Sequence, residues 1–262
     1  MVNAHSLMGV EMRLPEQVYI KHEPRPVLAD FFLAADKFAA ERGVLLSIST
    51  DFDELQALNR RNRDSWLPMM PSVSPDYCDM TKHQAFWLKG VDTETGETVL
   101  ARAARLYDLP APRTLHSELV GMTLFYDHPQ VARPFEIVNT TCVAPKGISG
   151  RFVLSIAGWH HPSVRKLNLS AVAPRVVRAL AYNEWMPEMF ISFVEDELAE
   201  KAKQAYGMQN QEVGVHWSGS YIADDLYLTL FWMTPAQLLS GLEAFVDMAK
   251  SAPSERQRYI AA

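Results

Sequence analysis

The order of apolar segments in this sequence predicts a mixed α/β fold, and three observations indicate it. A β-prone run at 152–159 is followed by helical spacing of apolar residues up to Trp185. Two further β-prone runs, at 84–91 and 98–107, flank a polar turn as the strands of a hairpin do. Strands and helices then alternate over 189–248. Such an alternation is typical of a sheet flanked by helices.

The other elements follow from apolar spacing and from residues that begin or end helices. Gly43 and Gly207 each end a helix, Thr50 begins one, and Thr234 with Pro235 begins the last. In chain order we expect an extended arm to about residue 25, helix 27–42, strand 44–49, helix 51–66, a proline-containing loop 68–79, strands 84–91 and 98–107, a helix within 114–126, strand 134–141, strand 152–159, a helix from 169 to 185, strand 189–194, helix 196–206, strands 212–217 and 226–233, and helix 234–248.

Composition and charge exclude several classes of protein. Hydrophobic residues make up 48% of the chain and charged residues 21%, which is ordinary for a globular protein. The net charge of −6 provides no overall attraction to nucleic acid or to anionic lipid. No apolar run approaches the roughly 20 residues of a membrane span. With no visible secretory signal and only Cys78 and Cys142, both expected to be free thiols, we expect a cytoplasmic location without a nucleic-acid or membrane partner.

The length of the chain allows one large domain with a sizeable core. We expect residues 1–43 to form an arm and a helix that pack on the core, and residues 44–262 to form a single domain. Whether two copies pair as a homodimer, through a strand edge or the last helix, stays open.

The stretch from residue 151 to 185 carries the strongest chemical pattern. A strand leads through a basic turn at 165–170 into a helix. Unpaired N–H groups and the positive end of the helix dipole would face that turn, an arrangement that favours an anion. Arg165 and Lys166 would add charge-assisted hydrogen bonds to a phosphate. The sequence therefore predicts an anion site there, although an exposed turn with solvated charges is the alternative.

This segment resembles the acetyl-CoA-binding motif of the GNAT superfamily of N-acyltransferases. In that family an Arg/Gln-x-x-Gly-x-Gly/Ala turn binds the pyrophosphate of CoA. Arg165 matches the first position, whereas Leu167 or Asn168 and then Ser170 stand where the family has glycine. Glycine allows close approach of the backbone to phosphate, so its absence changes the turn.

The resemblance extends from about residue 44 to 233. It implies a mixed, mostly antiparallel sheet flanked by helices, with the N-terminal helix as an extension. It also implies an acyl-CoA co-substrate, acetyl-CoA or a longer ester, without a metal. The cofactor-binding residues implied are Ala157, Gly158 and Trp159 along the strand, and Arg165, Lys166, Leu167, Asn168, Leu169 and Ser170 in the turn.

The candidate catalytic residues are Tyr206, His160 and His161. Tyr206, in Ala205-Tyr206-Gly207-Met208, looks like the family tyrosine that protonates the leaving CoA thiolate. The two histidines follow a strand end, where open α/β sheets bind ligands, and a histidine with a pKa near 6.5 could accept a proton from an amine. A packed tyrosine at a helix end and packed or solvated histidines are the alternatives.

Weaker candidates complete the site. Glu136, Glu184 and Glu195 are further candidates for the base, and the loop 66–77 would lie near the acceptor by analogy with the family. The histidines and cysteines lack the spacing of a metal site. We therefore expect transfer of an acyl group from acyl-CoA to a small-molecule amine or similar acceptor. The alternatives are a protein of the same fold that binds a small molecule or a partner without acyl transfer, and an unrelated α/β protein.

Overall fold

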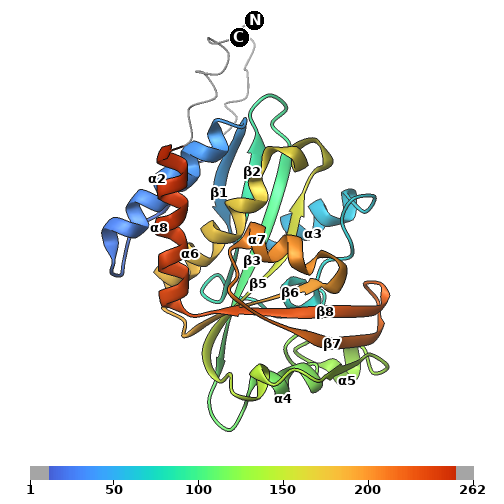
Figure 1. The fold of residues 1–262 in the computed structure, drawn as a ribbon. Coiled ribbons are helices and arrows are strands. Elements are labelled where there is room, and N and C mark those ends of the chain that lie inside the picture. The colour runs from blue at the N-terminus through green and yellow to red at the C-terminus, as the bar shows by residue number, and fades with distance from the viewer. Residues whose placement is uncertain (1–11, 252–262) are drawn as a thin grey trace, which may run out of the picture.

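The computed structural model describes residues 12–251, and one eight-stranded sheet runs through this part of the chain (Figure 1). Its strand order is β1-β2-β3-β5-β6-β8-β7-β4. The strands are β1 Val44–Ser49, β2 Ala85–Asp92, β3 Thr98–Leu109, β4 Ile137–Thr140, β5 Gly150–His160, β6 Met189–Glu195, β7 Asn210–Ser220 and β8 Asp224–Met233. The predicted mixed sheet and the β2–β3 hairpin are confirmed.

Helices cover both faces of the sheet. They are α1 Leu14–Gln17, α2 Arg25–Ala40, α3 Phe52–Arg61, α4 Leu115–Val120, α5 Pro129–Ala132, α6 Ala173–Trp185, α7 Ala199–Tyr206 and α8 Pro235–Ser251. Short 3-10 turns lie at Pro71–Val73, Ala144–Lys146, Pro162–Leu167, Leu169–Ala171 and Asp196–Leu198.

One parallel pair interrupts the otherwise antiparallel sheet. β5 and β6 pair in parallel over only three residue pairs, from Phe152 with Met189 to Leu154 with Ile191. Beyond Leu154, β5 continues to pair with β3 and β6 continues to pair with β8. The two strands therefore diverge, and the sheet divides into two halves with a gap between them.

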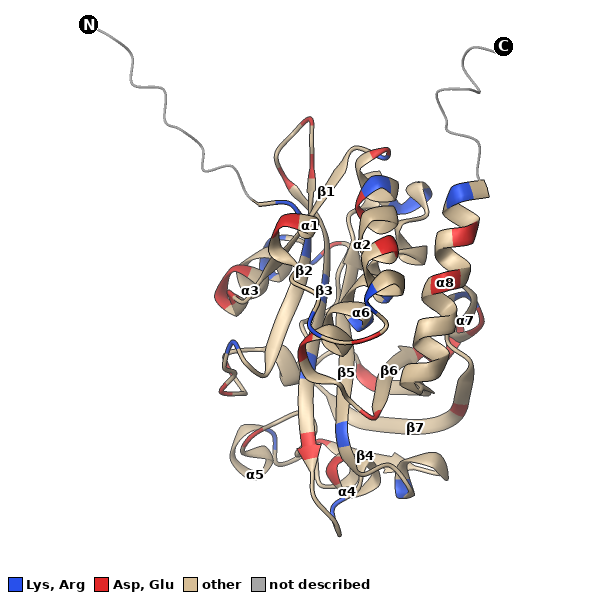
Figure 2. Cartoon of the chain, turned by 90° about the vertical axis from the view of Figure 1, so that its left-hand side faces the viewer, with Lys and Arg blue, Asp and Glu red and all other residues tan. Residues whose placement is uncertain are grey.

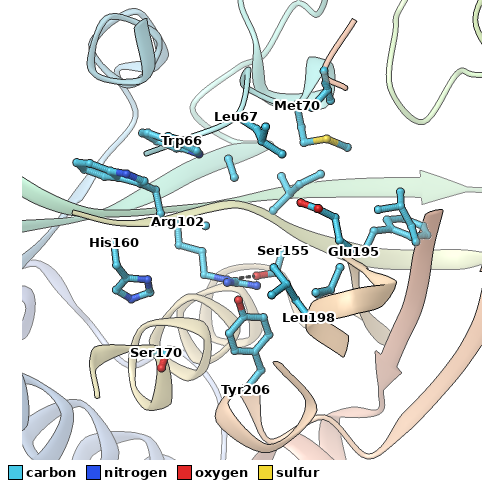
Figure 3. A pocket seen from close by; sticks show the side chains of 18 of the residues that line it. Trp66, Leu67, Met70, Arg102, Ser155, His160, Ser170, Glu195, Leu198 and Tyr206 are labelled. Atoms are coloured by element: carbon cyan, nitrogen blue, oxygen red, sulfur yellow. Dashed lines mark hydrogen bonds between the residues drawn. The ribbon is translucent and has the colours of Figure 1, made fainter. Parts of the chain in front are cut away.

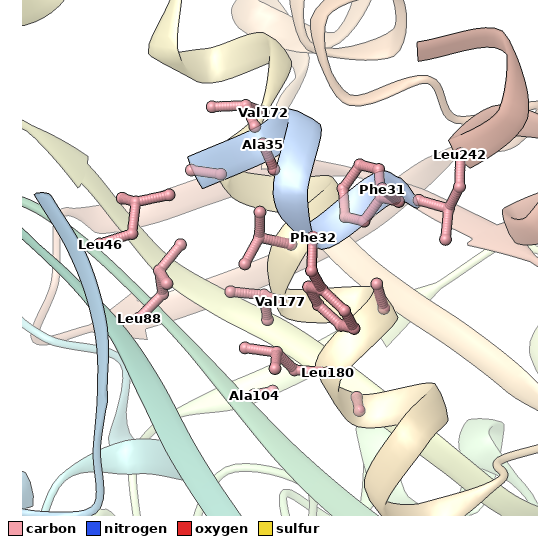
Figure 4. Close-up of a cluster of buried hydrophobic side chains, with 14 of the residues drawn as sticks. Phe31, Phe32, Ala35, Leu46, Leu88, Ala104, Val172, Val177, Leu180 and Leu242 are labelled. Atoms are coloured by element: carbon pink, nitrogen blue, oxygen red, sulfur yellow. The ribbon is translucent and has the colours of Figure 1, made fainter. Parts of the chain in front are cut away.

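The core lies on both sides of the sheet. On one face α2, α6 and α8 pack against the strands, and their buried apolar side chains interlock (Figure 4). Phe31 and Phe38 of α2 meet Phe245 of α8 edge-on, at centroid distances of 5.6 Å each. The second cluster lies under α3, α4 and the loop before β2, and it contains Trp87 and Trp217, both fully buried.

The helix after β5 begins later than the sequence predicts. α6 starts at Ala173 with Pro174 in its first turn, and residues 169–171 form a separate 3-10 turn. Proline lacks an N–H group and has a fixed φ, so it fits the first turn of a helix but not its interior. Pro174 therefore sets the start of α6, which no side chain caps.

Two other expectations are wrong in detail. The helix predicted for 51–66 ends at Arg61, although Asp51 caps its start by accepting from the Glu54 N–H at 2.9 Å, as expected. The described part of the N-terminal arm is not wholly extended, since α1 forms at Leu14–Gln17 with a proline in its first turn. Residues 1–11 lie outside the described part of the chain.

Charged residues of both signs are interspersed along the strands and helices (Figure 2). None of the helices in residues 12–251 combines the length and the apolar character that crossing a bilayer requires.

Candidate functional site

A cavity of about 640 Å³ opens where β5 and β6 part (Figure 3). Its lining comes from β3, β5, β6, α7, β8, the turn before α6 and the loop after α3. The residues that line it are Ser65, Trp66, Leu67, Pro68, Met70, Arg102, Ser155, Ile156, Ala157, Gly158, Trp159, His160, Arg165, Leu169, Ser170, Phe193, Val194, Glu195, Leu198, Lys201, Tyr206, Ile222, Leu226 and Leu228.

A β-bulge shapes the β5 wall of the cavity. Arg102 of β3 faces two residues of β5, Ala157 and Gly158, because the register shifts by one between their neighbours. Ala157 has φ = 53°, a left-handed conformation that costs a residue with a side chain about 1–2 kcal/mol. A bulge leaves one residue out of the ladder, so a backbone group of β5 is freed beside the gap.

The turn before α6 lies at one end of the cavity. Leu169 and Ser170 line it, and neither donates its backbone N–H to an acceptor within residues 12–251. Asn168, at one of the positions aligned with a glycine of the family motif, adopts the left-handed conformation with φ = 56°. Asparagine tolerates this conformation better than most residues. The turn can therefore present free amides without either family glycine.

The predicted turn residues do not all reach the cavity. Arg165 lines it, but its guanidinium also donates to the carbonyls of His160 (3.2 Å) and Ser65 (3.0 Å). Lys166 is exposed, Leu167 accepts a hydrogen bond from Arg42 at its carbonyl, and Asn168 is exposed. None of these three lines the cavity. Of the nine predicted cofactor-binding residues, the structure brings six together there: Ala157, Gly158, Trp159, Arg165, Leu169 and Ser170.

Tyr206 ends α7 and lies in the cavity wall (Figure 3). Gly207 follows it with φ = 65°, which ends the helix in the left-handed conformation. Arg178 and Arg175 of α6 donate to the carbonyls of Tyr206 and Ala205, the latter at 2.7 Å. Two arginines thus hold the C-terminal end of α7 against α6, which orients the tyrosine.

The two histidines lie in different places. His160 lines the cavity, whereas His161 lies outside it, contacts Ser163 through Nδ1 at 2.7 Å and meets Trp159 edge-on. Burial and, to a smaller extent, the charges of Arg102 and Arg165 together lower the pKa of His160 from 6.5 to about 4. His160 is therefore neutral at pH 7 but a weaker base than the sequence alone suggests.

The three glutamate candidates for the base lie in different parts of the structure. Glu195 lines the cavity at the end of β6. Glu136 is buried elsewhere and accepts from Tyr126 Oη (2.6 Å) and Trp217 Nε1 (3.0 Å). Glu184 forms an exposed ion pair with Lys21. Only Glu195 of the three is placed to accept a proton from a molecule in the cavity.

The loop after α3 covers one side of the cavity. Trp66 stacks on Trp159 of β5, with ring centroids 5.0 Å apart and planes 6° apart. Trp159 Nε1 donates to Ser65 Oγ at 3.1 Å. Met70 also lines the cavity, while Tyr77 packs against Tyr126 and Tyr221. The first half of the predicted 66–77 segment therefore reaches the site, and its second half does not.

The sequence reasoning missed Arg102 and Ser155. Both line the cavity, and Arg102 Nε donates to Ser155 Oγ at 3.0 Å. The available signal was a charged residue in the otherwise apolar run 98–104 of a central strand. In residues 12–251 no three His, Cys, Asp or Glu side chains are grouped so as to hold a metal ion.

The mixed, mostly antiparallel sheet flanked by helices agrees with the fold that the family resemblance implies. Several solved structures similar to this chain are acetyltransferases. Their similarity to this chain concerns the fold alone. A GNAT-family acetyltransferase from Bacillus anthracis has 8% identity, covers 73% of this chain and 94% of its own, and gives a TM-score of 0.36.

Two further solved structures have comparable values. The ribosomal-protein-S5-alanine acetyltransferase from Vibrio fischeri has 8% identity, coverages of 73% and 93%, and a TM-score of 0.41. NAA60 from Arabidopsis thaliana, solved in complex with acetyl-CoA, has 11% identity, coverages of 74% and 99%, and a TM-score of 0.39. No family model and no curated protein sequence matches this chain. The activities in these names belong to those proteins.

Proposed function

We propose that this protein transfers an acyl group from an acyl-CoA to a small-molecule amine. The observation that carries the proposal is the cavity between the parting strands β5 and β6, which ends at a turn with two free amides. A ligand with an anionic group suits this turn, because free amides and Arg165 face the cavity there. The thioester would supply the activated acyl group.

The residues present fit such a co-substrate. The free N–H groups of Leu169 and Ser170 would bind the pyrophosphate, and Arg165 would add positive charge beside it. The β5 segment past Leu154 has lost its β6 neighbour, so its backbone is free to bond the pantetheine. The bulge at Ala157 supports this further because it frees a backbone group in the cavity wall.

The chemistry proposed rests on groups that line the cavity. Tyr206 would donate a proton to the departing thiolate. Glu195, or a water beside it, would accept the proton of the attacking amine, and neutral His160 is the second candidate. The stacked Trp66 and Trp159 would help to exclude water. In such a site most of the rate comes from positioning and from a preorganised polar environment.

Binding of acyl-CoA tests the proposal directly. Thermal unfolding is followed with acetyl-CoA and longer esters, because a ligand at a hundred times its Kd stabilises a protein by about 2.7 kcal/mol. Ser170→Glu places a negative charge at the free amides, and we expect it to weaken binding at least about tenfold, or about 1.4 kcal/mol. Lys166→Gln lowers the net charge by the same amount outside the cavity.

We expect the Lys166→Gln control to change the Kd by less than about threefold, since exposed charges are screened by salt. If no CoA ester at millimolar concentration shifts the unfolding temperature of the wild type, the acyl-transfer proposal is wrong. A protein of this fold that binds another small molecule is then the better account.

A further inference from the structure

Arg102 is a buried cation that has no anionic partner within residues 12–251. Its side chain lies on β3 near the centre of the cavity and is only 4% exposed (Figure 3). Its single hydrogen bond within residues 12–251 runs from Nε to Ser155 Oγ, and it forms no ion pair there. Both Nη groups therefore lack an acceptor in the described part of the chain.

The surroundings of Arg102 fix the guanidinium rather than neutralise it. Its guanidinium carbon lies 4.4 Å from the centroid of the Tyr206 ring, a cation–π contact. Gly158 leaves room for Nη1, because a Cβ at that position would come within 2.7 Å of it. Contacts that hold a guanidinium in one orientation prepare it for a planar ligand.

Glu195 also lines the cavity, but no ion pair joins it to Arg102 within residues 12–251, and the nearby charges on α6 are positive. Arg178, 1% exposed, and Arg175 hold the end of α7 through carbonyl groups, and no carboxylate pairs with either within residues 12–251. The charges of Arg102 and Arg175 act on Arg178 and, with its burial, lower its pKa. A buried charge without a counter-ion is costly, so the site is arranged to receive an anion.

The apolar wall and the small number of donors near Arg102 restrict which kind of anion can bind there. Apolar side chains form much of the wall around Arg102, among them Ile156, Phe193, Leu226 and Leu228. A single guanidinium fork matches one carboxylate in a bidentate arrangement, and the Ser155 hydroxyl can donate a further bond. A doubly charged phosphate would need more donors than this wall offers.

We propose that Arg102 binds a carboxylate of the reacting molecules, so that the enzyme selects a carboxylate-bearing substrate with an otherwise apolar body. The carboxylate belongs either to the acceptor, as in an amino acid, or to the far end of the acyl group, as in a dicarboxylic acyl-CoA. This inference deepens the proposed function and rests on it for the acyl group.

Two matched comparisons distinguish the sources. In the acceptor comparison, binding of apolar amino acids such as L-phenylalanine is measured against their amides by calorimetry, without CoA. In the donor comparison, succinyl-CoA is measured against butyryl-CoA. In one of the two comparisons, the Kd of the wild type for the carboxylate-bearing ligand should be at least about tenfold lower than for its uncharged counterpart. That ratio is the equivalent of about 1.4 kcal/mol. Arg102→Met should reduce that preference to less than about twofold.

Arg105 provides the control on the same strand. It is ion-paired with Asp127 at 3.3 Å and donates to the Ser72 carbonyl at 2.8 Å, outside the cavity. Arg105→Met should lower the unfolding temperature and keep the carboxylate preference. Arg102→Met should not lower the unfolding temperature, because it removes an unpaired buried charge. Arg102→Lys, which keeps the charge but not the fork, should keep part of the preference.

The inference is overturned if the wild type prefers the carboxylate in neither comparison, or if Arg102→Met and Arg102→Lys both keep the full preference. The two proposals fail separately. If no CoA ester binds, acyl transfer is wrong, and the amino-acid comparison still measures what Arg102 recognises.

Discussion

Two buried charged residues, Glu136 and Arg102, differ in how many hydrogen-bond partners they have. Glu136 is 7% exposed and accepts from Tyr126, Trp217 and the backbone of Tyr221, with Arg133 at 3.7 Å. Such a saturated network has a structural purpose, since every donor around the carboxylate is used. Arg102 is buried equally well but keeps two donor groups free. The two residues therefore differ in how fully their hydrogen-bonding groups are used within residues 12–251, not in burial.

His160 should make the stability of the protein depend on pH between about 4 and 6.5. Its pKa is lowered in the folded state to about 4, so the unfolded chain takes up a proton first as the pH falls. Stability is therefore present above pH 6.5 and is lost as the pH falls toward 4. A pKa lower by about 2.5 corresponds to at most about 3 kcal/mol at the acid end.

Urea unfolding at pH 7 and pH 4.5 checks this expectation. His160→Gln should reduce the difference in unfolding free energy between the two pH values, whereas replacement of the exposed His128 by Gln should leave it as in the wild type. An unchanged difference in His160→Gln would show that the ring is solvated.

The residues of the site were predictable mainly where they lie in one continuous segment or match the family resemblance, as Tyr206 does. Residues 157–170 are close in sequence, so a strand, a basic turn and a helix predicted an anion site there, and the resemblance implied the individual residues. Arg102 and Ser155 come from two strands, and nothing in a single sequence states that β3 pairs with β5 or that a bulge places Gly158 opposite Arg102. The lowered pKa of His160 was likewise hidden, because it depends on neighbours distant in sequence.

At the scale of elements, existence was easier to predict than boundaries. β1 agrees with its prediction residue for residue, since β-prone residues are bounded there by Gly43 and by a capped helix. The start of α6 was placed too early because Leu169 continues the apolar spacing, while Pro174 decides the backbone. The 3-10 turn at 169–171, with its free amides, is therefore the part of the site that helix and strand propensities predict least well.

The loop after α3 should depend on the stacked tryptophans. Trp66 is 8% exposed and stacks on Trp159, so Trp66→Ala removes a large contact that holds the loop on β5. We expect faster tryptic cleavage at the nearby Arg60, Arg61 and Arg63, and a higher KM for the acceptor. Limited proteolysis measures the first effect. Leu67→Ala, at a neighbouring side chain that is 46% exposed, should be cleaved at nearly the wild-type rate.

At the scale of the molecule, the N-terminal helix belongs to the core. Phe31 is fully buried and packs against Phe32 (Figure 4). It also contacts Phe245 of α8, 214 positions later in the chain. The division into a segment 1–43 and a domain 44–262 remains our proposal for the chain, with the helix as an integral part of the folding unit. Pairing of two copies also stays a prediction, with β1 and β4 as the sheet edges.

Phe31→Ala should lower the free energy of unfolding by about 3–5 kcal/mol, because a large core side chain is lost and a cavity remains. Leu33→Ala on the same helix removes a side chain that is 60% exposed, and we expect a change within about 0.5 kcal/mol. Urea denaturation followed by circular dichroism should show one transition in each variant. If residues 44–262 alone unfold with wild-type stability, the helix is a dispensable addition.

Only three residue pairs join β5 to β6, so two four-stranded halves share a narrow seam. Rotation about that seam would widen or narrow the space between the halves without breaking the pairing inside either one. A molecule bonded to both strands would act as a crosslink and slow amide exchange throughout β6 and β8, well beyond the residues it touches.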